Sequence, residues 1–260
     1  MLFSPLFSGS SGNATLVEAG GVRILVDAGL TGKRIEQALE TVNAPAQTLN
    51  AILVTHEHSD HIRGVGVLSR RYNIPVYANA GCWSAMEKII GPIAPSCMRV
   101  FETGRDFFIN NVNILPFATP HDAAEPVGYT FEHKNEKAGL LTDIGCMEAE
   151  LYDAVYGCRL LLIEANHDEE MLRNGPYPYP LKQRILSRKG HLSNADSARA
   201  LCRLYSRGLR YAVLGHLSAE NNDERVAMET VKSTLHEQDV YDMNVLMSHR
   251  DRPCGVFHIE

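Results

Sequence analysis

Three histidines and an aspartate stand close together in T-H-E-H-S-D-H, which covers residues 55–61 and directly follows a short apolar run. His56 and His58 are two residues apart, so on an extended segment their side chains project to the same side. Where the chain then turns toward the next helix, Asp60 and His61 can point into the same space. Imidazole nitrogens and carboxylate oxygens together suit Zn²⁺ or another borderline divalent cation. The spacing therefore predicts a metal site, with a solvent-exposed polar loop as the alternative interpretation.

Three further polar residues each follow an expected strand, at positions far apart in the sequence. They are His121 in P-F-A-T-P-H-D, Asp143 in L-L-T-D-I-G and His216 in A-V-L-G-H-L-S. A single histidine after a strand is more often structural, so each of these signals gains weight only beside the 56–61 cluster. Four ligands on one short loop cannot close around one ion without strain, but they can serve two ions when distant segments complete both coordination shells.

These motifs resemble those of the metallo-β-lactamase fold superfamily, whose H-x-H-x-D-H signature stands here at positions 56–61. The later residues match the superfamily pattern in order, so the resemblance covers nearly the whole chain. It implies an α/β fold of four layers, an αββα sandwich, with the site at one edge of the two sheets. It also implies two divalent metal ions, one held by His56, His58 and His121, another by Asp60, His61 and His216, with Asp143 bridging both. Zn²⁺, Mn²⁺ and Fe²⁺ all accept such ligands.

A pair of divalent ions points to hydrolysis as the reaction class. Ions about 3.5–4 Å apart can share a water molecule and lower its pKa toward neutrality, which supplies a metal-bridging hydroxide as nucleophile at pH 7. The same ions can accept negative charge that develops on a carbonyl or phosphoryl oxygen. Superfamily members cleave β-lactams, thioesters, lactones and phosphodiesters, so fold and metals alone leave the substrate open.

A loop rich in glycine and serine, S-G-S-S-G-N at 8–13, favours an anionic substrate. Its small residues let backbone N–H groups approach an anion, and Ser10, Ser11 and Asn13 add donors. We therefore expect these three residues to bind substrate. An ordinary flexible turn would explain the same composition.

A second motif, K-G-H-L-S-N-A-D at 189–196, places His191 directly before an expected helix that Ser193 could cap. Together with the strand end E-A-N-H-D at 164–168, it resembles elements of the transfer-RNA 3′-processing ribonucleases. The resemblance implies that His191 faces the scissile phosphate and gives a proton to the leaving oxygen. Asp60 and His191 are thus the candidate catalytic residues, and a helix-start histidine without a role is the alternative for His191.

The chain as a whole resembles the WalJ/YycJ-like family of bacterial metallo-β-lactamase-fold proteins. The resemblance rests on the runs SGSSGNAT, THEHSDHIRG, TPHDAAEPVGY, TDIG, EANHD, GPYPYPLKQRI, GHLSN and GHLSAENN. It implies a metal-dependent nuclease, with 5′-to-3′ exonuclease activity on DNA, rather than on RNA, as the favoured assignment.

Basic residues cluster directly before His191, and we expect Lys182, Arg184 and Lys189 to contact substrate phosphates. A second basic set over 199–210 is more simply explained as a solvated helix face. The net charge of −6 argues against a protein coated in nucleic acid but allows a local basic patch.

Two other functions fit parts of the pattern. A thioester or lactone hydrolase would use the same ions without needing His191 or the basic run over 182–189. A non-catalytic metal-binding regulator would be expected to have lost at least one ligand, whereas the set here is complete.

The elements that must position these residues are short. Strand-like runs alternate with helical patterns along 260 residues that are 45% hydrophobic, and we expect one layered α/β domain over 1–260. Gly20-Gly21 predicts a hairpin, the Pro-rich run 174–182 a surface loop, and Asn221 with Glu224 a capping box for the last helix.

The composition also bears on the compartment. No run approaches the ~20 apolar residues that a bilayer span needs, and the N-terminus lacks the basic region of a signal peptide. The six cysteines form no C-x-x-C pair. We therefore expect a cytoplasmic protein with reduced thiols and no membrane contact.

Overall fold

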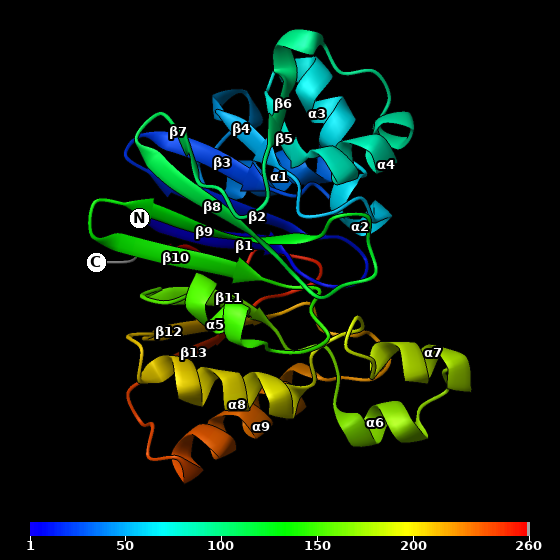
Figure 1. The fold of residues 1–260 in the computed structure, drawn as a ribbon, viewed down its shortest axis with the longest axis vertical. Coiled ribbons are helices and arrows are strands. Elements are labelled where there is room, and N and C mark those ends of the chain that lie inside the picture. Colours follow the sequence, from blue (N-terminus) through cyan, green and yellow to red (C-terminus); the bar gives the residue numbers. More distant parts are fainter. Residues whose placement is uncertain (259–260) are drawn as a thin grey trace.

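Two sheets face each other in the computed structural model, which describes residues 1–258, and helices cover the outer face of each sheet (Figure 1). The first sheet is built, in spatial order, from β14 (Phe257–His258), β1 (Leu2–Phe7), β2 (Ala14–Ala19), β3 (Val22–Val26), β4 (Ala51–Leu53), β5 (Val76–Asn79) and β6 (Met98–Phe101). The second is built from β13 (Asn244–Met247), β12 (Tyr211–Gly215), β11 (Leu160–Glu164), β10 (Glu136–Leu141), β9 (Val127–His133), β8 (Val112–Ala118) and β7 (Phe107–Ile109).

The helices form the two outer layers. On the first sheet lie α1 (Gly32–Thr41), α2 (Ser59–Ile62), α3 (Val65–Tyr72) and α4 (Ala80–Ile90), with the short 3₁₀ turns η1 (Ala46–Thr48) and η2 (Pro95–Cys97). On the second lie α5 (Ala149–Ala154), α8 (Asn194–Tyr205) and α9 (Glu224–Glu237). The pair α6 (Glu169–Asn174) and α7 (Tyr179–Ile185) projects to the side of the second sheet (Figure 1). No helix of residues 1–258 is long and apolar enough to cross a membrane.

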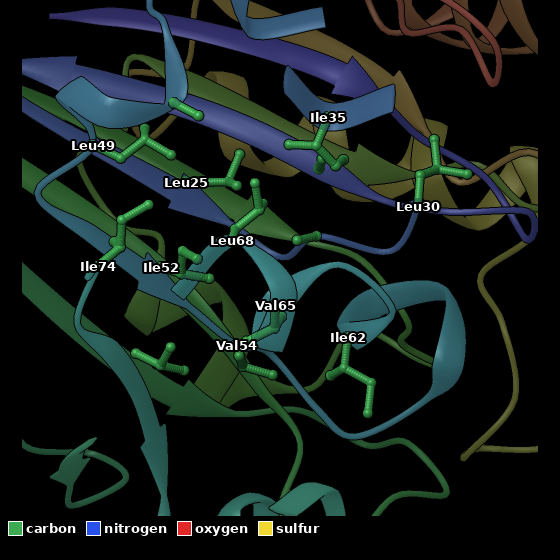
Figure 2. Close-up of a cluster of buried hydrophobic side chains, with 14 of the residues drawn as sticks. Leu25, Leu30, Ile35, Leu49, Ile52, Val54, Ile62, Val65, Leu68 and Ile74 are labelled. Carbon is green, nitrogen blue, oxygen red and sulfur yellow. The ribbon is translucent and has the colours of Figure 1, made fainter. Parts of the chain in front are cut away.

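A strand contributes side chains to two hydrophobic cores, because its side chains alternate between the two faces of the sheet. In β3, Ile24 and Val26 pack between the sheets, whereas Leu25 packs under the helices of the first layer (Figure 2). In β11, Leu162 likewise faces the other sheet and Leu161 faces the helices of the last layer. Three buried clusters therefore fill the three gaps between four layers, and the expected αββα sandwich is confirmed.

Two local predictions hold. Gly20 and Gly21 both have positive φ, 55° and 81°, as a two-residue turn between antiparallel strands requires, and they join β2 to β3. The side chain of Ser193 accepts a hydrogen bond from the backbone N–H of Asp196 and caps α8.

Two other local predictions are wrong. Asp223, not Asn221, caps α9, because the Asn221 side chain is buried and turned toward the Ser218 hydroxyl. The Pro-rich run 174–182 is a loop only in its first part, since α7 begins at Tyr179. Proline fits the first turn of a helix, where the missing N–H would have no partner.

The chemistry-bearing residues share one edge of the sandwich. Strands β3 and β4 run parallel in the first sheet, and β10, β11 and β12 run parallel in the second. Their carboxyl ends point to the side on which α2 and α7 lie (Figure 1). In such sheets, the segments that follow the carboxyl ends of the strands form the binding crevice.

Candidate metal centre

All seven predicted ligands lie together at this edge. His56 and His58 follow β4, Asp60 and His61 lie on α2, His121 follows β8, Asp143 follows β10, and His216 follows β12. Two groups of three contain six of them, and two further groups link Asp143 to these, one with His56 and His61 and one with His216, Glu164 and His191. Within each group the ligand atoms lie within 4.8 Å of one another.

The first group consists of His56, His58 and His121. Nε2 of His56 lies 3.0 Å from Nδ1 of His58, and the ring of His121 lies 5.1 Å and 5.2 Å from the rings of His56 and His58. Three imidazoles thus surround one point, which is the donor set of an open zinc-type site.

The second group consists of Asp60, His61 and His216. Oδ2 of Asp60 lies 3.7 Å from Nε2 of His61 and 3.9 Å from Nε2 of His216. A carboxylate and two imidazoles again face one point.

Asp143 stands between the two groups. Its Oδ1 lies 3.8 Å from Nε2 of His121 and 3.4 Å from Nε2 of His216, and its Oδ2 lies 3.3 Å from Nε2 of His61. Both Asp143 and His216 have a φ of 56°, in the left-handed region that non-glycine residues rarely adopt. Such strain persists only where the surrounding structure enforces it, and it recurs at functional sites.

The cluster fits divalent cations, as its own hydrogen bonding indicates. Oδ2 of Asp143 and Nε2 of His216 are buried and have no hydrogen-bond partner among residues 1–258. An unsatisfied buried polar group costs about 1–3 kcal/mol, so native proteins seldom leave one without a purpose. Both orphaned atoms point into the cluster and are of the types that divalent cations bind.

Two buried carboxylates contact predicted ligand histidines at their Nδ1 atoms. Neither carboxylate was predicted as part of the site. Asp27 accepts hydrogen bonds from the N–H and the hydroxyl of Thr55, each at 2.9 Å, and contacts Nδ1 of His61 at 2.8 Å. Oε1 of Glu164 contacts Nδ1 of His216 at 2.8 Å. Partners of this kind fix which nitrogen of a histidine faces the metal.

The electrostatics agree with a site built for positive charge. Burial lowers the pKa of His56 well below its usual value, and the neighbouring His61 lowers it further, so His56 stays neutral and able to bind a cation. Burial alone would raise the pKa of Asp143, but His216 and His61 bring it well below its usual value. Burial would lower the pKa of His216, yet Asp143, Asp60 and Glu164 raise it to about 10. Without a cation, protons therefore occupy the cluster, and metal binding would release them.

Glu164 also positions His191. Nδ1 of His191 lies 2.7 Å from Oε1 of Glu164, and Oε2 of Glu164 accepts a hydrogen bond from the N–H of Ile144 at 2.8 Å. The His191 ring lies 5.3 Å from the rings of both His121 and His216. Burial opposes the charge on Glu164, but the charge and hydrogen bond of His191 lower the pKa of Glu164 to about 2. With Nδ1 engaged, Nε2 of His191 remains for a ligand in front of the metal cluster.

Two hollows flank the cluster. One, which we call the His191 hollow, measures about 170 Å³ and is lined by His191, His216, Tyr177, Leu181, Arg184 and Ser10, among others. The other, the Arg63 hollow, measures about 400 Å³ and is lined by Arg63, Asp60, Ser59, Ser10, Ser11 and Ile89, among others. A larger hollow of about 530 Å³ between β6 and β7 contains none of the predicted site residues.

The predicted residues of the 8–13 loop lie at the site. Ser10 and Ser11 are exposed on the hollows. Asn13 is buried; its amide oxygen accepts from the N–H of Gly9 at 2.9 Å, and its amide nitrogen lies 3.0 Å from Nε2 of His61. Asn13 thus holds the loop against a predicted ligand rather than facing solvent.

Of the predicted basic residues, only Arg184 reaches the site. It lines the His191 hollow and pairs with Asp122, the neighbour of His121, at 2.6 Å. Lys182 donates instead to the carbonyl oxygen of Arg173, and Lys189 is exposed but lines neither hollow.

The arginines over 199–210 serve as structural contacts. Arg203 lies over the Tyr152 ring at 4.1 Å, and Arg207 pairs with Asp153. These contacts attach α8 to α5, away from the hollows, and agree with the simpler interpretation of this set.

Fold and site together define a class of protein. Residues 22–217 match the family model of the beta-lactamase superfamily domain, so the chain belongs to that family and is a metal-dependent hydrolase. Within it, the chain is 44% identical over 240 residues to Exodeoxyribonuclease WalJ of Streptococcus pneumoniae, a match that covers 92% of this chain and 89% of the relative. It is 41% identical over 236 residues to Exodeoxyribonuclease YycJ of Bacillus anthracis, with coverage of 91% and 89%. The predicted kinship with the WalJ/YycJ-like family is confirmed.

A solved structure supports the fold. The metallo-β-lactamase fold protein YhfI of Bacillus subtilis matches with a TM-score of 0.74 over 98% of both chains, at 16% sequence identity. At this identity the likeness concerns the fold alone.

Proposed function

We propose that the protein is a dinuclear metal-dependent nuclease that removes nucleotides from DNA in the 5′-to-3′ direction. The observation that carries the proposal is the double contact of Glu164. One buried carboxylate oxygen holds both His216, a predicted metal ligand, and His191, which faces the cluster from outside the predicted ligand set. A hydrolase that acts on a poor leaving group needs such a proton donor beside its metals.

The seven ligands would hold two divalent cations, for which Zn²⁺, Mn²⁺ and Fe²⁺ are all suitable. When bound, the cations supply an activated water as nucleophile and neutralise charge on the phosphoryl oxygens. Asp143 keeps the two groups of ligands together, and Asp27 and Glu164 orient His61 and His216. His191 would deliver a proton from Nε2 to the leaving oxygen, while Glu164 holds its Nδ1.

The choice of DNA rests on the relatives. Two proteins that match more than nine-tenths of this chain are named exodeoxyribonucleases. The proposal is also supported by Ser10, Ser11 and Arg184, which line the hollows beside the cluster and would contact substrate phosphates. A phosphodiester would meet hydroxyl donors there, together with the part of the Arg184 guanidinium that its contact with Asp122 leaves available.

The experiment that tests the proposal is digestion of end-labelled nucleic acid by protein loaded with Zn²⁺, Mn²⁺ or Fe²⁺. Single- and double-stranded DNA and RNA carry the label at the 5′ or the 3′ end. We expect immediate release of a 5′ label, progressive shortening of a 3′-labelled strand, and no cleavage of a circular single strand. Cleavage of the circle, or release of the 3′ label first, would contradict the exonuclease or its polarity.

The same preparation distinguishes a nuclease from a thioester or lactone hydrolase. His191→Ala is compared with His236→Ala, an exposed histidine on α9. We expect wild type to cleave DNA and not S-lactoylglutathione, and only His191→Ala to lose activity on DNA. Thioester turnover that His191→Ala leaves intact, without DNA cleavage, would favour the small-molecule hydrolase.

A further inference from the structure

Each of the two hollows is lined by a different member of one predicted metal group, and the two linings share one residue. Asp60 lines the Arg63 hollow and His216 lines the His191 hollow, and Oδ2 of Asp60 lies 3.9 Å from Nε2 of His216. Ser10 lines both hollows. A ligand whose phosphate sits on the cluster therefore has both hollows within reach.

The His191 hollow is the smaller of the two, and one of its walls is fixed. Tyr177 and Leu181, in α7 and the loop before it, form its outer side. The wall is anchored to the body, because the N–H of His191 donates to the carbonyl oxygen of Ile185 at 2.9 Å. Gly190 packs so tightly that a Cβ there would lie 2.1 Å from the same oxygen. The volume of the His191 hollow, about 170 Å³, is less than half that of the Arg63 hollow, so this hollow suits the smaller part of a substrate.

The Arg63 hollow is larger, and a positively charged side chain that has no partner among residues 1–258 lines it. Arg63 is exposed, and its guanidinium has no hydrogen bond or ion pair within residues 1–258. Other arginines near the edge are engaged: Arg184 pairs with Asp122, and Arg188 pairs with Glu148. A planar guanidinium without a partner, beside serine hydroxyls, matches the geometry of a phosphate.

Close contacts hold the backbone at Arg63 in place. It directly follows α2, and its N–H donates to the carbonyl oxygen of Ser59 at 3.3 Å. The next residue, Gly64, packs so closely on the neighbouring loop that a Cβ would lie 2.6 Å from the carbonyl oxygen of Leu30. Ile89, 64% exposed on α4, adds an apolar surface on which a base could lie. The side chain of Arg63 is thus presented to the hollow by a rigid backbone.

We propose that the Arg63 hollow binds the sugar–phosphate backbone of the strand that remains on the enzyme, and that the His191 hollow takes the single nucleotide that leaves. The proposal rests on the proposed nuclease function and deepens it. In each turnover an oxygen of water bonds to phosphorus, the P–O3′ bond breaks, and the departing 3′ oxygen takes a proton from His191. The leaving group is then the 5′-terminal nucleotide, and the retained strand acquires a new 5′ phosphate.

The division of the cleft predicts that Arg63 matters more for long substrates than for short ones. Binding of a fluorescent 12-nucleotide single strand is measured in EDTA, where no cleavage occurs, for wild type, Arg63→Ala, Arg63→Lys and the control Arg105→Ala. Arg105 is exposed and lies in the distant hollow between β6 and β7. We expect Arg63→Ala to weaken binding about tenfold and to lower the slope of log K against log salt by about 1, with partial recovery in Arg63→Lys.

Steady-state kinetics give the second readout. With metal present, Arg63→Ala should raise KM for the 12-mer at least fivefold more than KM for a dinucleotide, which has no phosphate beyond the cleaved one. Wild type should release mononucleotides. Equal binding by Arg63→Ala and wild type, equal KM effects on both substrates, or release of dinucleotides would overturn the proposal. A wild type that cleaves no nucleic acid at all would instead refute the proposed function.

Discussion

Asp143 and Glu164 show how two buried carboxylates with similar surroundings take different places in one site. Oδ2 of Asp143 faces the cluster and has no hydrogen-bond partner among residues 1–258. Glu164 instead uses both carboxylate oxygens in contacts with Ile144, His191 and His216. The first is suited to bind cations and the second to orient histidines. Both are almost fully buried, so what separates their roles is which atoms they meet.

Replacing Glu164 should weaken metal binding as well as catalysis. Glu164→Gln keeps the shape but removes the charge that holds Nδ1 of His216 and Nδ1 of His191. We expect metal affinity to fall by about 10–100-fold, measured by competition with a chromophoric chelator. Glu169→Gln, on the exposed side of α6, is the matched control. Unchanged affinity in Glu164→Gln would show that this contact does not support the metal site.

The role of His191 can be tested with two leaving groups. A proton donor matters for the alkoxide of a sugar and little for p-nitrophenolate, which leaves without protonation. We expect His191→Ala to reduce kcat on DNA by about 10²–10⁴-fold and on bis(p-nitrophenyl) phosphate by less than about tenfold. Equal losses on both substrates would assign His191 to metal binding or to folding rather than to proton transfer.

Among individual residues, the seven metal ligands were predicted from the sequence. The two carboxylates that orient them, Asp27 and Glu164, were not. Histidines crowded at a strand end have little other use, so the predicted ligands stood out. Asp27 and Glu164 are single acids at the ends of apolar strands, and their meaning depends on which histidines the fold brings to them. An acid ending a buried strand, as in L-L-L-I-E, was the one available signal.

Among the elements, the turn that carries the first ligands is held by close backbone packing. The loop that follows β3 passes so near α2 that a Cβ on Gly29 would lie 1.6 Å from the carbonyl oxygen of Asp60. That loop also accepts, through the carbonyl oxygen of Ala28, the N–H of Gly64 at 2.7 Å. The position of the ligands on α2 therefore depends on a neighbouring strand end and not on α2 alone.

A methyl group at position 29 should disturb this arrangement. We expect Gly29→Ala to lower the free energy of unfolding by about 1–3 kcal/mol in urea titrations of metal-free protein, because the backbones must move apart. Gly32→Ala is the control, since the nearest atom to its Cβ would be a side-chain atom, Val67 Cγ1 at 3.0 Å, and it lies at the start of α1. Its effect should stay within about 1 kcal/mol. Equal stability of Gly29→Ala and wild type would show that the two segments can separate freely.

The elements themselves were largely predictable, and their ends were not. Apolar runs such as 51–55 and 159–165 contain strands, yet the strands stop at Leu53 and Glu164, where the chain turns to present polar side chains. The N-cap of α9 is Asp223 and not the predicted Asn221, because tertiary contacts bury Asn221. The start of α7 at Tyr179 was missed because the Pro-rich run was predicted to be a surface loop, whereas proline also fits the first turn of a helix.

At the scale of the whole molecule, the site joins the two halves of the sandwich. The first sheet and α2 supply His56, His58, Asp60 and His61, while strands of the second sheet lead to His121, Asp143 and His216. Cations bound among these residues would tie the sheets together at one edge, in addition to the core between them.

Metal binding should therefore stabilise the fold. A ligand that binds only the native state adds about 2.7 kcal/mol at a free concentration of 100 Kd. We expect Zn²⁺ or Mn²⁺ to raise Tm in thermal unfolding monitored by circular dichroism, and a chelator to reverse the change. Asp143→Asn should lose most of the gain, because Asp143 faces both groups of ligands. A Tm that does not respond to metal would be inconsistent with ions that bridge the sheets.

The most direct test of the central claim is anomalous diffraction from crystals of the protein loaded with Mn²⁺ or Zn²⁺. We predict two anomalous peaks in each molecule, one among His56, His58 and His121 and another among Asp60, His61 and His216, with Asp143 in contact with both. A single peak, or peaks elsewhere in the chain, would contradict a dinuclear centre.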